Sequence, residues 1–157
     1  YFKDLHPDAH HSVADRRNGY IEAMQKAGLE FRDITPDHKI DDSVEKQIDL
    51  FYSVLKRPDR PTAMLFYWSY SVPSVYAAAA RLDLRIPKDL SIITFAGESH
   101  LRIGLTATAM LEPETDMGRE AVNMLRKKMT LKQKNIPSKR LEYIFAPMYT
   151  CQKAPNP

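Results

Sequence analysis

Helical and extended segments alternate along this chain of 157 residues, and that alternation limits the folds open to it. Apolar residues recur at helical spacing in four segments. The predicted helices cover 12–27, about 42–57, about 71–83 and about 113–126. Short runs that are continuously apolar or alternating, as in strands, lie between them. The predicted strands cover 29–34, 62–66, 89–95, about 105–110 and 140–147.

Strands that alternate with helices favour one fold class. Such a chain forms an α/β fold, with a mostly parallel sheet and helices on both of its faces. In folds of this kind the ligand occupies the crevice at the carboxyl ends of the strands. The predicted fold class is therefore α/β, and a small-molecule site is expected where the strands end.

Composition excludes several classes of protein. Hydrophobic residues make up 43% of the chain and charged residues 27%, as in a globular domain. The formal net charge of +3 is too small to indicate a nucleic-acid surface by itself. Cys151 is the single cysteine, which excludes an intrachain disulfide and suits the reducing cytoplasm. No apolar run approaches the roughly 20 residues that span a bilayer, so no membrane partner is expected.

The stretch HPDAHH combines His6, Asp8, His10 and His11, residue types that bind divalent metals. Pro7 opposes a regular helix through it, and no distant segment offers an obvious further ligand. We favour an exposed polar loop and predict no metal site, while a metal-dependent α/β enzyme stays open as a minor alternative. The chain has no nucleophile-elbow motif and no glycine-rich phosphate loop, so neither catalytic residues nor a cofactor are predicted.

Two arginines and two glutamates stand at predicted helix starts. Arg16 and Arg17 lie in the first turn of the first helix, where the helix dipole disfavours a positive charge. We therefore predict that at least one of them reaches across the strand ends toward a polar ligand or a carboxylate, which a guanidinium binds as a fork. Glu112 and Glu114 flank Pro113, and the same dipole favours their charge at the start of the last helix.

Four segments, in a fixed order, resemble bacterial transcription regulators of the LacI/GalR family. The first is DRRNGYIEAMQKAGLE, which matches the family's R-x-x-G-[FY] helix, and the second is RPTAMLF, which matches its Pro-Thr-Ala strand. The other two are AAARLDLRIPKDLSIITF and LTATAMLEPETDMGREAVNML. The resemblance extends from about Ser12 to Pro147, and 86–91 with its flanks is its most specific part.

The resemblance implies a type I periplasmic-binding-protein-like effector domain rather than an enzyme. In that family two α/β subdomains clasp a small effector, often a sugar or a nucleobase, and the domain forms a homodimer. An N-terminal helix-turn-helix, which is not present in this chain, binds operator DNA in the cytoplasm. The implied division places the C-terminal subdomain at 1–106, a crossover strand and helix of the N-terminal subdomain at 107–135, and a return strand and tail at 136–157.

The implied effector site is only partly of the family's type. Arg16 falls on the family's ligand-binding arginine. The family's Asn-Asp pair is replaced by Trp68 and Ser69, and its aspartate after the next strand is replaced by Ala96. Glu98, two residues later, offers a substitute carboxylate. The predicted effector-binding residues are Arg16, Tyr67, Trp68, Ser69, Ala96 and Glu98.

Three aromatic residues of FYWSYS, at 66–71, lie where a buried strand gives way to a helix: Tyr67, Trp68 and Tyr70. They could stack on a sugar or a base, or plug the cleft, and Trp68 could equally pack against a neighbouring subdomain. A second function also stays open, that of a periplasmic solute-binding protein that delivers a sugar to a transporter. A signal peptide upstream would favour transport, and a helix-turn-helix would favour regulation.

Overall fold

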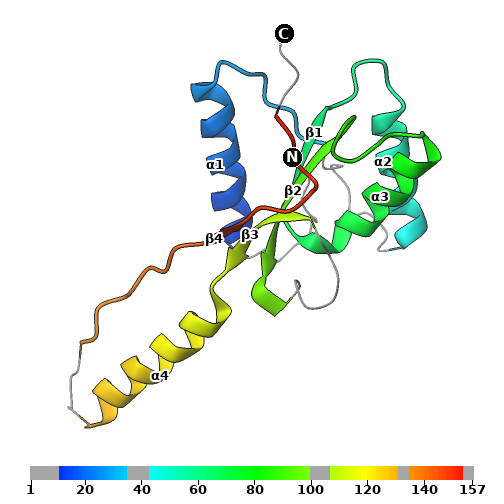
Figure 1. The fold of residues 1–157 in the computed structure, drawn as a ribbon. Coiled ribbons are helices and arrows are strands. Elements are labelled where there is room, and N and C mark those ends of the chain that lie inside the picture. The colour runs from blue at the N-terminus through cyan, green and yellow to red at the C-terminus, as the bar shows by residue number, and fades with distance from the viewer. Residues whose placement is uncertain (1–10, 35–42, 100–106, 131–134, 154–157) are drawn as a thin grey trace.

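Three parallel strands and one antiparallel strand form the sheet around which the chain is arranged. The computed structural model describes residues 11–34, 43–99, 107–130 and 135–153. The strand order is β1-β2-β3-β4 (Figure 1). The parallel strands are β1 (Ala63–Phe66), β2 (Ser91–Gly97) and β3 (Thr108–Glu112), and β4 (Ile144–Ala146) runs antiparallel to β3. The predicted α/β class, with a mostly parallel sheet, is confirmed.

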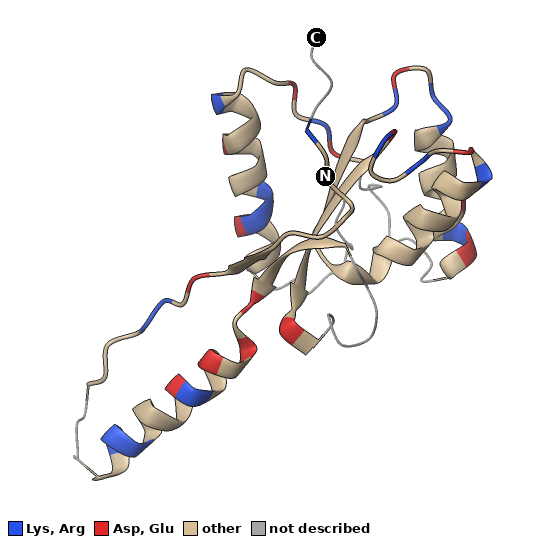
Figure 2. Cartoon of the chain, in the orientation of Figure 1, with Lys and Arg blue, Asp and Glu red and all other residues tan. Residues whose placement is uncertain are grey.

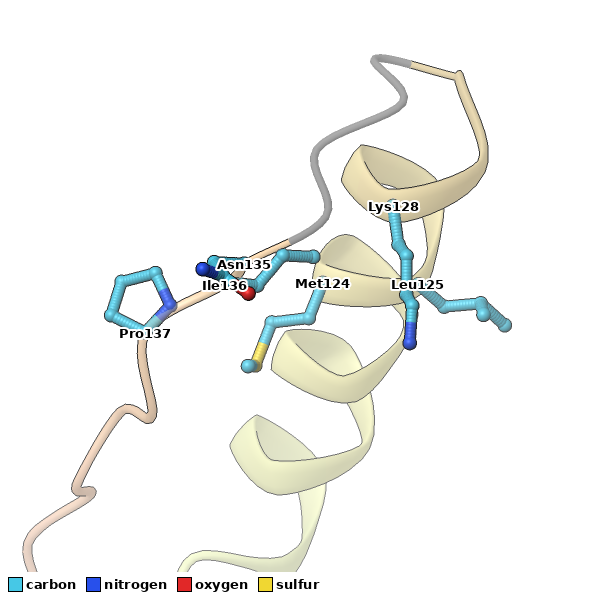
Figure 3. A pocket seen from close by; sticks show the side chains of 6 residues that line it. All are labelled: Met124, Leu125, Lys128, Asn135, Ile136 and Pro137. Carbon is cyan, nitrogen blue, oxygen red and sulfur yellow. The ribbon is translucent and has the colours of Figure 1, made fainter.

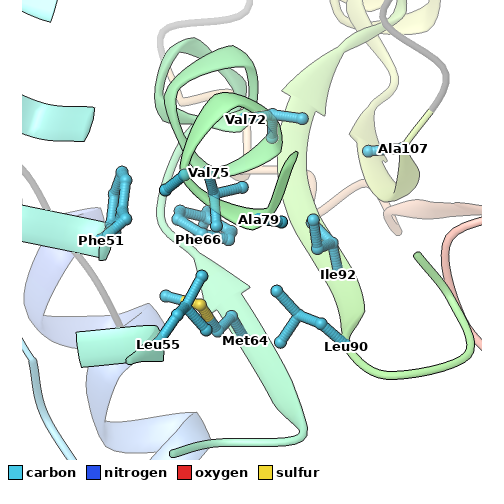
Figure 4. Close-up of a cluster of buried hydrophobic side chains, with 11 residues drawn as sticks. Phe51, Leu55, Met64, Phe66, Val72, Val75, Ala79, Leu90, Ile92 and Ala107 are labelled. Atoms are coloured by element: carbon cyan, nitrogen blue, oxygen red, sulfur yellow. The ribbon is translucent and has the colours of Figure 1, made fainter. Parts of the chain in front are cut away.

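Two helices, α2 (Val44–Leu55) and α3 (Val72–Arg81), pack on β1 and β2 and form the main core with them. Phe51 of α2 meets Phe66 of β1 edge to face, with ring centroids 5.6 Å apart. Figure 4 shows this cluster, in which apolar side chains from both helices and both strands interlock. Burying these side chains is the main favourable contribution to folding on this side of the sheet.

On the other side of the sheet in Figure 1 stands α1 (Ser12–Lys26). The helix ends where Gly28 adopts a φ of 65°, as its sequence position predicts. Val13 is the only residue of α1 that is buried. Contacts of its first turn, rather than an apolar face, therefore attach this helix to the sheet.

The predicted start of the second helix and one predicted strand differ from the structure. The helix α2 begins at Val44, and the side chain of Ser43 caps it by accepting a hydrogen bond from the Lys46 N–H. The strand predicted at 29–34 is wrong, because this segment has no strand structure. Its side chains bind other segments instead: Phe31 packs on Tyr20 of α1, with ring centroids 5.7 Å apart, and Arg32 donates to the Asp59 carbonyl at 2.8 Å. An alternating pattern alone therefore did not provide a ladder partner.

The last helix, α4 (Glu114–Thr130), projects away from the sheet (Figure 1). It has the predicted apolar residues at helical spacing, but none of its residues is buried. Its exposed large apolar side chains are Met117, Val122, Leu125 and Met129. The described residues 135–137 lie alongside part of this helix, but these four side chains stay exposed. No helix in the described part of the chain is long and apolar enough to cross a membrane.

The segment after β4 returns to the sheet, where the buried Thr150, 3% exposed, lies between β2 and the start of β3. Its hydroxyl accepts a hydrogen bond from the Thr108 N–H at 2.7 Å and donates one to the Ile92 carbonyl at 2.7 Å. The Thr150 carbonyl in turn accepts from the Ile92 N–H at 2.8 Å. One side chain thus joins β2 to the start of β3.

Replacing Thr150 with valine keeps the shape of the side chain and removes its hydroxyl. We expect the free energy of unfolding to fall by about 2 kcal/mol, because the buried Thr108 N–H loses an acceptor. Urea denaturation followed by circular dichroism measures this change. Thr130→Val, at the exposed end of α4, is the matched control and should cost less than about 0.5 kcal/mol. Equal effects of the two substitutions would contradict the bridging role.

Arg85 and Asp89 form an ion pair that fixes the local structure of residues 86–91. Asp89 accepts hydrogen bonds from the Arg85 Nε at 2.6 Å, from its second guanidinium nitrogen at 3.0 Å and from the Arg85 N–H at 2.9 Å. The side-chain hydrogen bond from Arg85 holds the pKa of Asp89 well below its usual range. Because its folded-state pKa is depressed, this carboxylate stabilises the fold above its unfolded-state pKa of about 3.9 and stops doing so as the pH falls.

Asp89→Asn should therefore lower the thermal midpoint near pH 7, and the difference from the wild type should shrink below about pH 4. Calorimetric melts at a series of pH values check this. Asp49→Asn, which removes the exposed pair with Arg81, serves as the control for an ordinary surface ion pair. A difference that stays constant down to acid pH would show that the Asp89 charge is not the cause.

Candidate functional site

The carboxyl ends of the parallel strands meet the first turn of α1. Tyr67 and Trp68 follow β1 directly and lead into a short 3-10 helix, η1 (Ser69–Ser71). The hydroxyls of Ser12, in α1, and Tyr67 lie 3.0 Å apart and share a hydrogen bond. The edge that the sequence predicted for a ligand is therefore the edge at which α1 begins.

Arg16 is the centre of the polar contacts at this edge. Its guanidinium donates to the Tyr67 carbonyl at 3.0 Å and to the Tyr143 hydroxyl at 2.7 Å, and it forms a salt bridge with Glu112. The Tyr143 hydroxyl also donates to Glu112, at 3.3 Å. The prediction that an arginine of this turn reaches across the strand ends toward a carboxylate is confirmed. Arg17 turns the other way and pairs with Asp33 at 2.9 Å.

Aromatic rings surround the same guanidinium. Its central carbon lies 4.5 Å from the ring centroid of Phe95 and 4.7 Å from that of Tyr67. The centroids of Tyr143 and Trp68 lie at 5.7 and 5.8 Å. All four distances fall within the range of cation–π attraction. The Arg16 side chain is only 7% exposed, so this attraction acts with little screening by water.

Two buried polar atoms, Arg16 Nε and Ser69 Oγ, have no hydrogen-bond partner among the residues that the structure describes. Buried polar groups are nearly always paired, so each such exception calls for an explanation. Ser69 follows Trp68 directly, and Arg16 binds the carbonyl one residue before that. Ser69 is therefore two residues along the chain from a residue that Arg16 binds.

At the junction of β2 and α4, the carboxylates of Glu98 and Glu114 each accept a hydrogen bond from the residue that follows the other glutamate. The Glu98 carboxylate accepts from the Thr115 N–H at 3.2 Å and from its hydroxyl at 2.9 Å, which caps the start of α4. The Glu114 carboxylate accepts from the Ser99 N–H at 3.2 Å. A Cβ at Gly97 would lie 2.0 Å from the Glu114 carboxylate, so a larger residue there would displace this side chain from its present position. The structure thus engages Glu98 with α4 rather than with Arg16.

Ala96 also lies apart from Arg16. It is buried in a small apolar cluster with Ala109 and Leu111 of β3. Side chains alternate across a strand, so the neighbouring Phe95 faces the opposite side, where its ring contacts Arg16 and Tyr143. Of the predicted site residues, the structure brings Arg16, Tyr67 and Trp68 together, with Ser69 next along the chain.

Sequence reasoning missed three members of the Arg16 cluster: Phe95, Glu112 and Tyr143. Phe95 reads as one more apolar residue of a buried strand. The interpretation of Glu112 as a residue at a helix start is wrong, because it is the last residue of β3, and Pro113 separates it from α4. One signal could have found it: the ends of parallel strands share an edge, so a carboxylate that ends a strand lies near the other strand ends.

A hollow of about 660 Å³ lies away from this edge, between α4 and the segment 135–137 (Figure 3). Its lining is mainly apolar and consists of Met124, Leu125, Lys128, Asn135, Ile136 and Pro137. Polar side chains do not converge there as they do around Arg16. The described residues also contain no cluster of His, Cys, Asp and Glu that could hold a metal ion. Three of the four HPDAHH residues lie outside those ranges, and His11 immediately precedes α1.

The fold and this cluster define a class of protein, the α/β domains whose polar residues converge at the carboxyl ends of parallel strands. A model of the family described as periplasmic binding protein-like domain matches residues 5–146. The chain belongs to this periplasmic binding protein-like domain family.

Its relatives include LacI-type transcription regulators. The HTH-type transcriptional repressor PurR of Serratia proteamaculans is 28% identical over 114 residues, which are 70% of this chain and 32% of that protein. A putative LacI-family regulator from Rhizobium etli superposes with a TM-score of 0.76 at 22% identity, over 96% of this chain and 55% of the other. The complex of the transcriptional regulator CelR with cellobiose superposes with a TM-score of 0.69 at 18% identity, over 94% of this chain and 45% of the other.

These matches confirm the resemblance to the effector-binding domain of LacI-family regulators. The chain spans about a third of the length of the PurR relative.

Arg16→Met keeps the length of the side chain and removes its charge. We expect a loss of about 2 kcal/mol in the free energy of unfolding, because three hydrogen bonds and the partner of Glu112 disappear. Arg17→Met is the matched control, since its pair with Asp33 is more exposed, and it should cost less than about 1 kcal/mol. Chemical denaturation of both variants measures the difference, and a more harmful Arg17→Met would contradict the central position of Arg16.

Proposed function

We propose that this chain is the ligand-sensing part of a LacI-type transcription regulator and that a small effector binds at the carboxyl ends of its strands. One observation carries the proposal. Arg16, enclosed by aromatic rings at this edge, keeps an Nε–H without a partner among the described residues, and the hydroxyl of Ser69, two residues after Tyr67, lacks one as well. A ligand that supplies partners to both atoms would remove two costs of burial at once.

The residues would divide the work by their chemistry. Arg16 anchors the ligand through its Nε–H, and Ser69 contributes its hydroxyl. The rings of Tyr67 and Trp68 provide flat apolar area, which suits the apolar face of a sugar or the plane of a base. Ala96 leaves room at the strand end without contributing a hydrogen bond. Glu98 acts indirectly in this proposal, by fixing the start of α4 beside the site.

Sugar-like and nucleoside-like effectors are the two classes that this lining suits. CelR holds cellobiose in its complex, which supports the sugar-like class for a domain of this fold. Stacking rings without the usual aspartate anchor equally suit a nucleobase, which presents a larger flat surface and fewer hydroxyl groups. The proposal therefore keeps both classes for the first titration.

The same proposal extends to the rest of the regulator. The segment 1–106 acts as the C-terminal subdomain, 107–135 provides a crossover strand and helix of the N-terminal subdomain, and 136–157 returns. The apolar side of α4 supports this division, because a helix with exposed Met117, Val122 and Leu125 needs a further surface to pack on. The complete protein forms a homodimer in the cytoplasm and binds operator DNA through a helix-turn-helix outside this chain.

Effector binding would act by shifting populations. A ligand that binds one arrangement of the two subdomains more tightly than another favours that arrangement, and the dimer passes the shift to the DNA-binding part. Relatives that are named transcriptional repressors support regulation over solute transport and over enzymatic activity. No catalytic role is assigned to any residue of the site.

Isothermal titration of the intact protein with cellobiose, glucose, adenosine and inosine tests the proposal. A sugar or a nucleoside should bind saturably, and Arg16→Ala should weaken that binding about tenfold to hundredfold, the cost of a lost charge-assisted hydrogen bond. Arg17→Ala, whose side chain points to Asp33, is the control and should leave affinity unchanged. Unchanged affinity in Arg16→Ala would remove Arg16 from the site, and no binding of any probe would refute both proposed classes.

A further inference from the structure

The three nitrogens of the Arg16 guanidinium differ in how many hydrogen bonds they donate. One terminal nitrogen donates to the Tyr67 carbonyl, and the other donates to both Glu112 and Tyr143. Only Nε, of these three nitrogens, has no partner among the described residues. A carboxylate or phosphate ligand is bound best by two parallel N–H groups of one guanidinium. Such a fork is not available here, because the chain's own oxygens already occupy the two terminal nitrogens.

Glu112 is placed to control access to that charge. It is the last residue of β3 and pairs in register with Gly97, the last residue of β2. One carboxylate oxygen, Oε1, receives both Arg16 and the Tyr143 hydroxyl. No described residue donates to the other oxygen, and the side chain is 27% exposed. Glu112 therefore neutralises Arg16 with one oxygen and keeps the second one free to accept a hydrogen bond.

Two further carboxylates lie at the junction of β2 and α4. Glu98 and Glu114 follow the ends of β2 and β3, and Figure 2 shows acidic residues gathered where these strands end and α4 begins. The backbone N–H groups that these two carboxylates accept carry no charge that would neutralise them. Among the described residues that contact one another at this edge, Arg16 is the only cation, since Arg17 points to Asp33. The described residues at this edge thus carry more negative than positive charge despite the central arginine.

We infer that Glu112 is the specificity-determining residue of this site and that it selects against anionic ligands. A ligand that carries a carboxylate or a phosphate would have to displace Glu112 from Arg16 and then remain beside it at the cost of charge repulsion. A neutral polyol, a neutral base or an amine has no such conflict and can donate a hydrogen bond to the free oxygen. This inference names the charge class of the effector and rests on the proposed function.

The substitution Glu112→Gln tests the inference with inorganic phosphate as the probe. It removes one negative charge with almost no change of shape, so phosphate should reach Arg16. Trp68 reports the event, because it is the only tryptophan of the chain and its ring lies 5.8 Å from the guanidinium. At constant ionic strength, phosphate should change Trp68 fluorescence saturably in Glu112→Gln, at least about tenfold more tightly than in the wild type.

Glu142→Gln is the matched control. It removes the same charge from an exposed residue next to Tyr143 that makes no hydrogen bond to Arg16. This variant should respond to phosphate like the wild type. The double variant Arg16→Gln/Glu112→Gln should lose the response again, which locates the phosphate at Arg16. Equal phosphate binding by the wild type and Glu112→Gln would overturn the inference, and so would the absence of a response in every variant.

If Glu112→Gln does not fold, quenching of Trp68 fluorescence in the wild-type protein tests whether the edge is negative. Caesium should quench Trp68 fluorescence more strongly than iodide does, after each is normalised to free tryptophan, because a negative edge attracts the cation and repels the anion. Stronger quenching by iodide would overturn the inference. These outcomes differ from those of the sugar and nucleoside titration: the absence of binding by every probe refutes the proposed function, whereas the phosphate results report on Glu112 and the quenching results report on the charge around Trp68.

Discussion

A guanidinium that leaves water must find partners for its charge and its donors, and most of the strand edge is arranged around that requirement of Arg16. Its partners come from three separate places: the end of β1, the end of β3 and the return segment before β4. Because α1 buries only Val13, these contacts also fix the position of the helix. The ionic cluster around Arg16 therefore holds α1 against the sheet, whereas burial in the apolar core holds α2 and α3.

The aromatic turn after β1 follows from the same requirement. Strand ends in α/β folds commonly carry small or polar residues, yet Tyr67 and Trp68 stand here with their rings within 6 Å of the Arg16 charge. Their faces stabilise a cation that water no longer reaches. Tyr67 and Trp68 thus stabilise the buried charge of Arg16, whether or not they also stack on an effector.

The sequence allowed the buried elements to be predicted better than the surface ones. Continuous apolar runs located β1 and β2, because burial on both faces leaves few alternatives, and Gly28 located the end of α1. The segment 29–34 was misassigned because alternation says nothing about whether a ladder partner exists. Glu112 was misassigned for a related reason: its partner is 96 residues away in the chain, so only the three-dimensional meeting of strand ends reveals it. The opposition between a positive charge and the local helix dipole pointed to Arg16 and Arg17 together, and the family resemblance then singled out Arg16.

The Arg16–Glu112 pair also links binding to movement. A ligand that takes up the free Nε–H of Arg16 must fit the present positions of α1, β1 and β3, because the same guanidinium holds all three. A ligand that needs more of the guanidinium must break one of these contacts and loosen α1, which has little apolar burial to hold it. Ligands can shift an equilibrium only by their different affinities for its states. In the proposed function such a difference would arise from how many of the contacts of Arg16 a ligand leaves intact, so selection of the ligand and the response to it would depend on the same few hydrogen bonds.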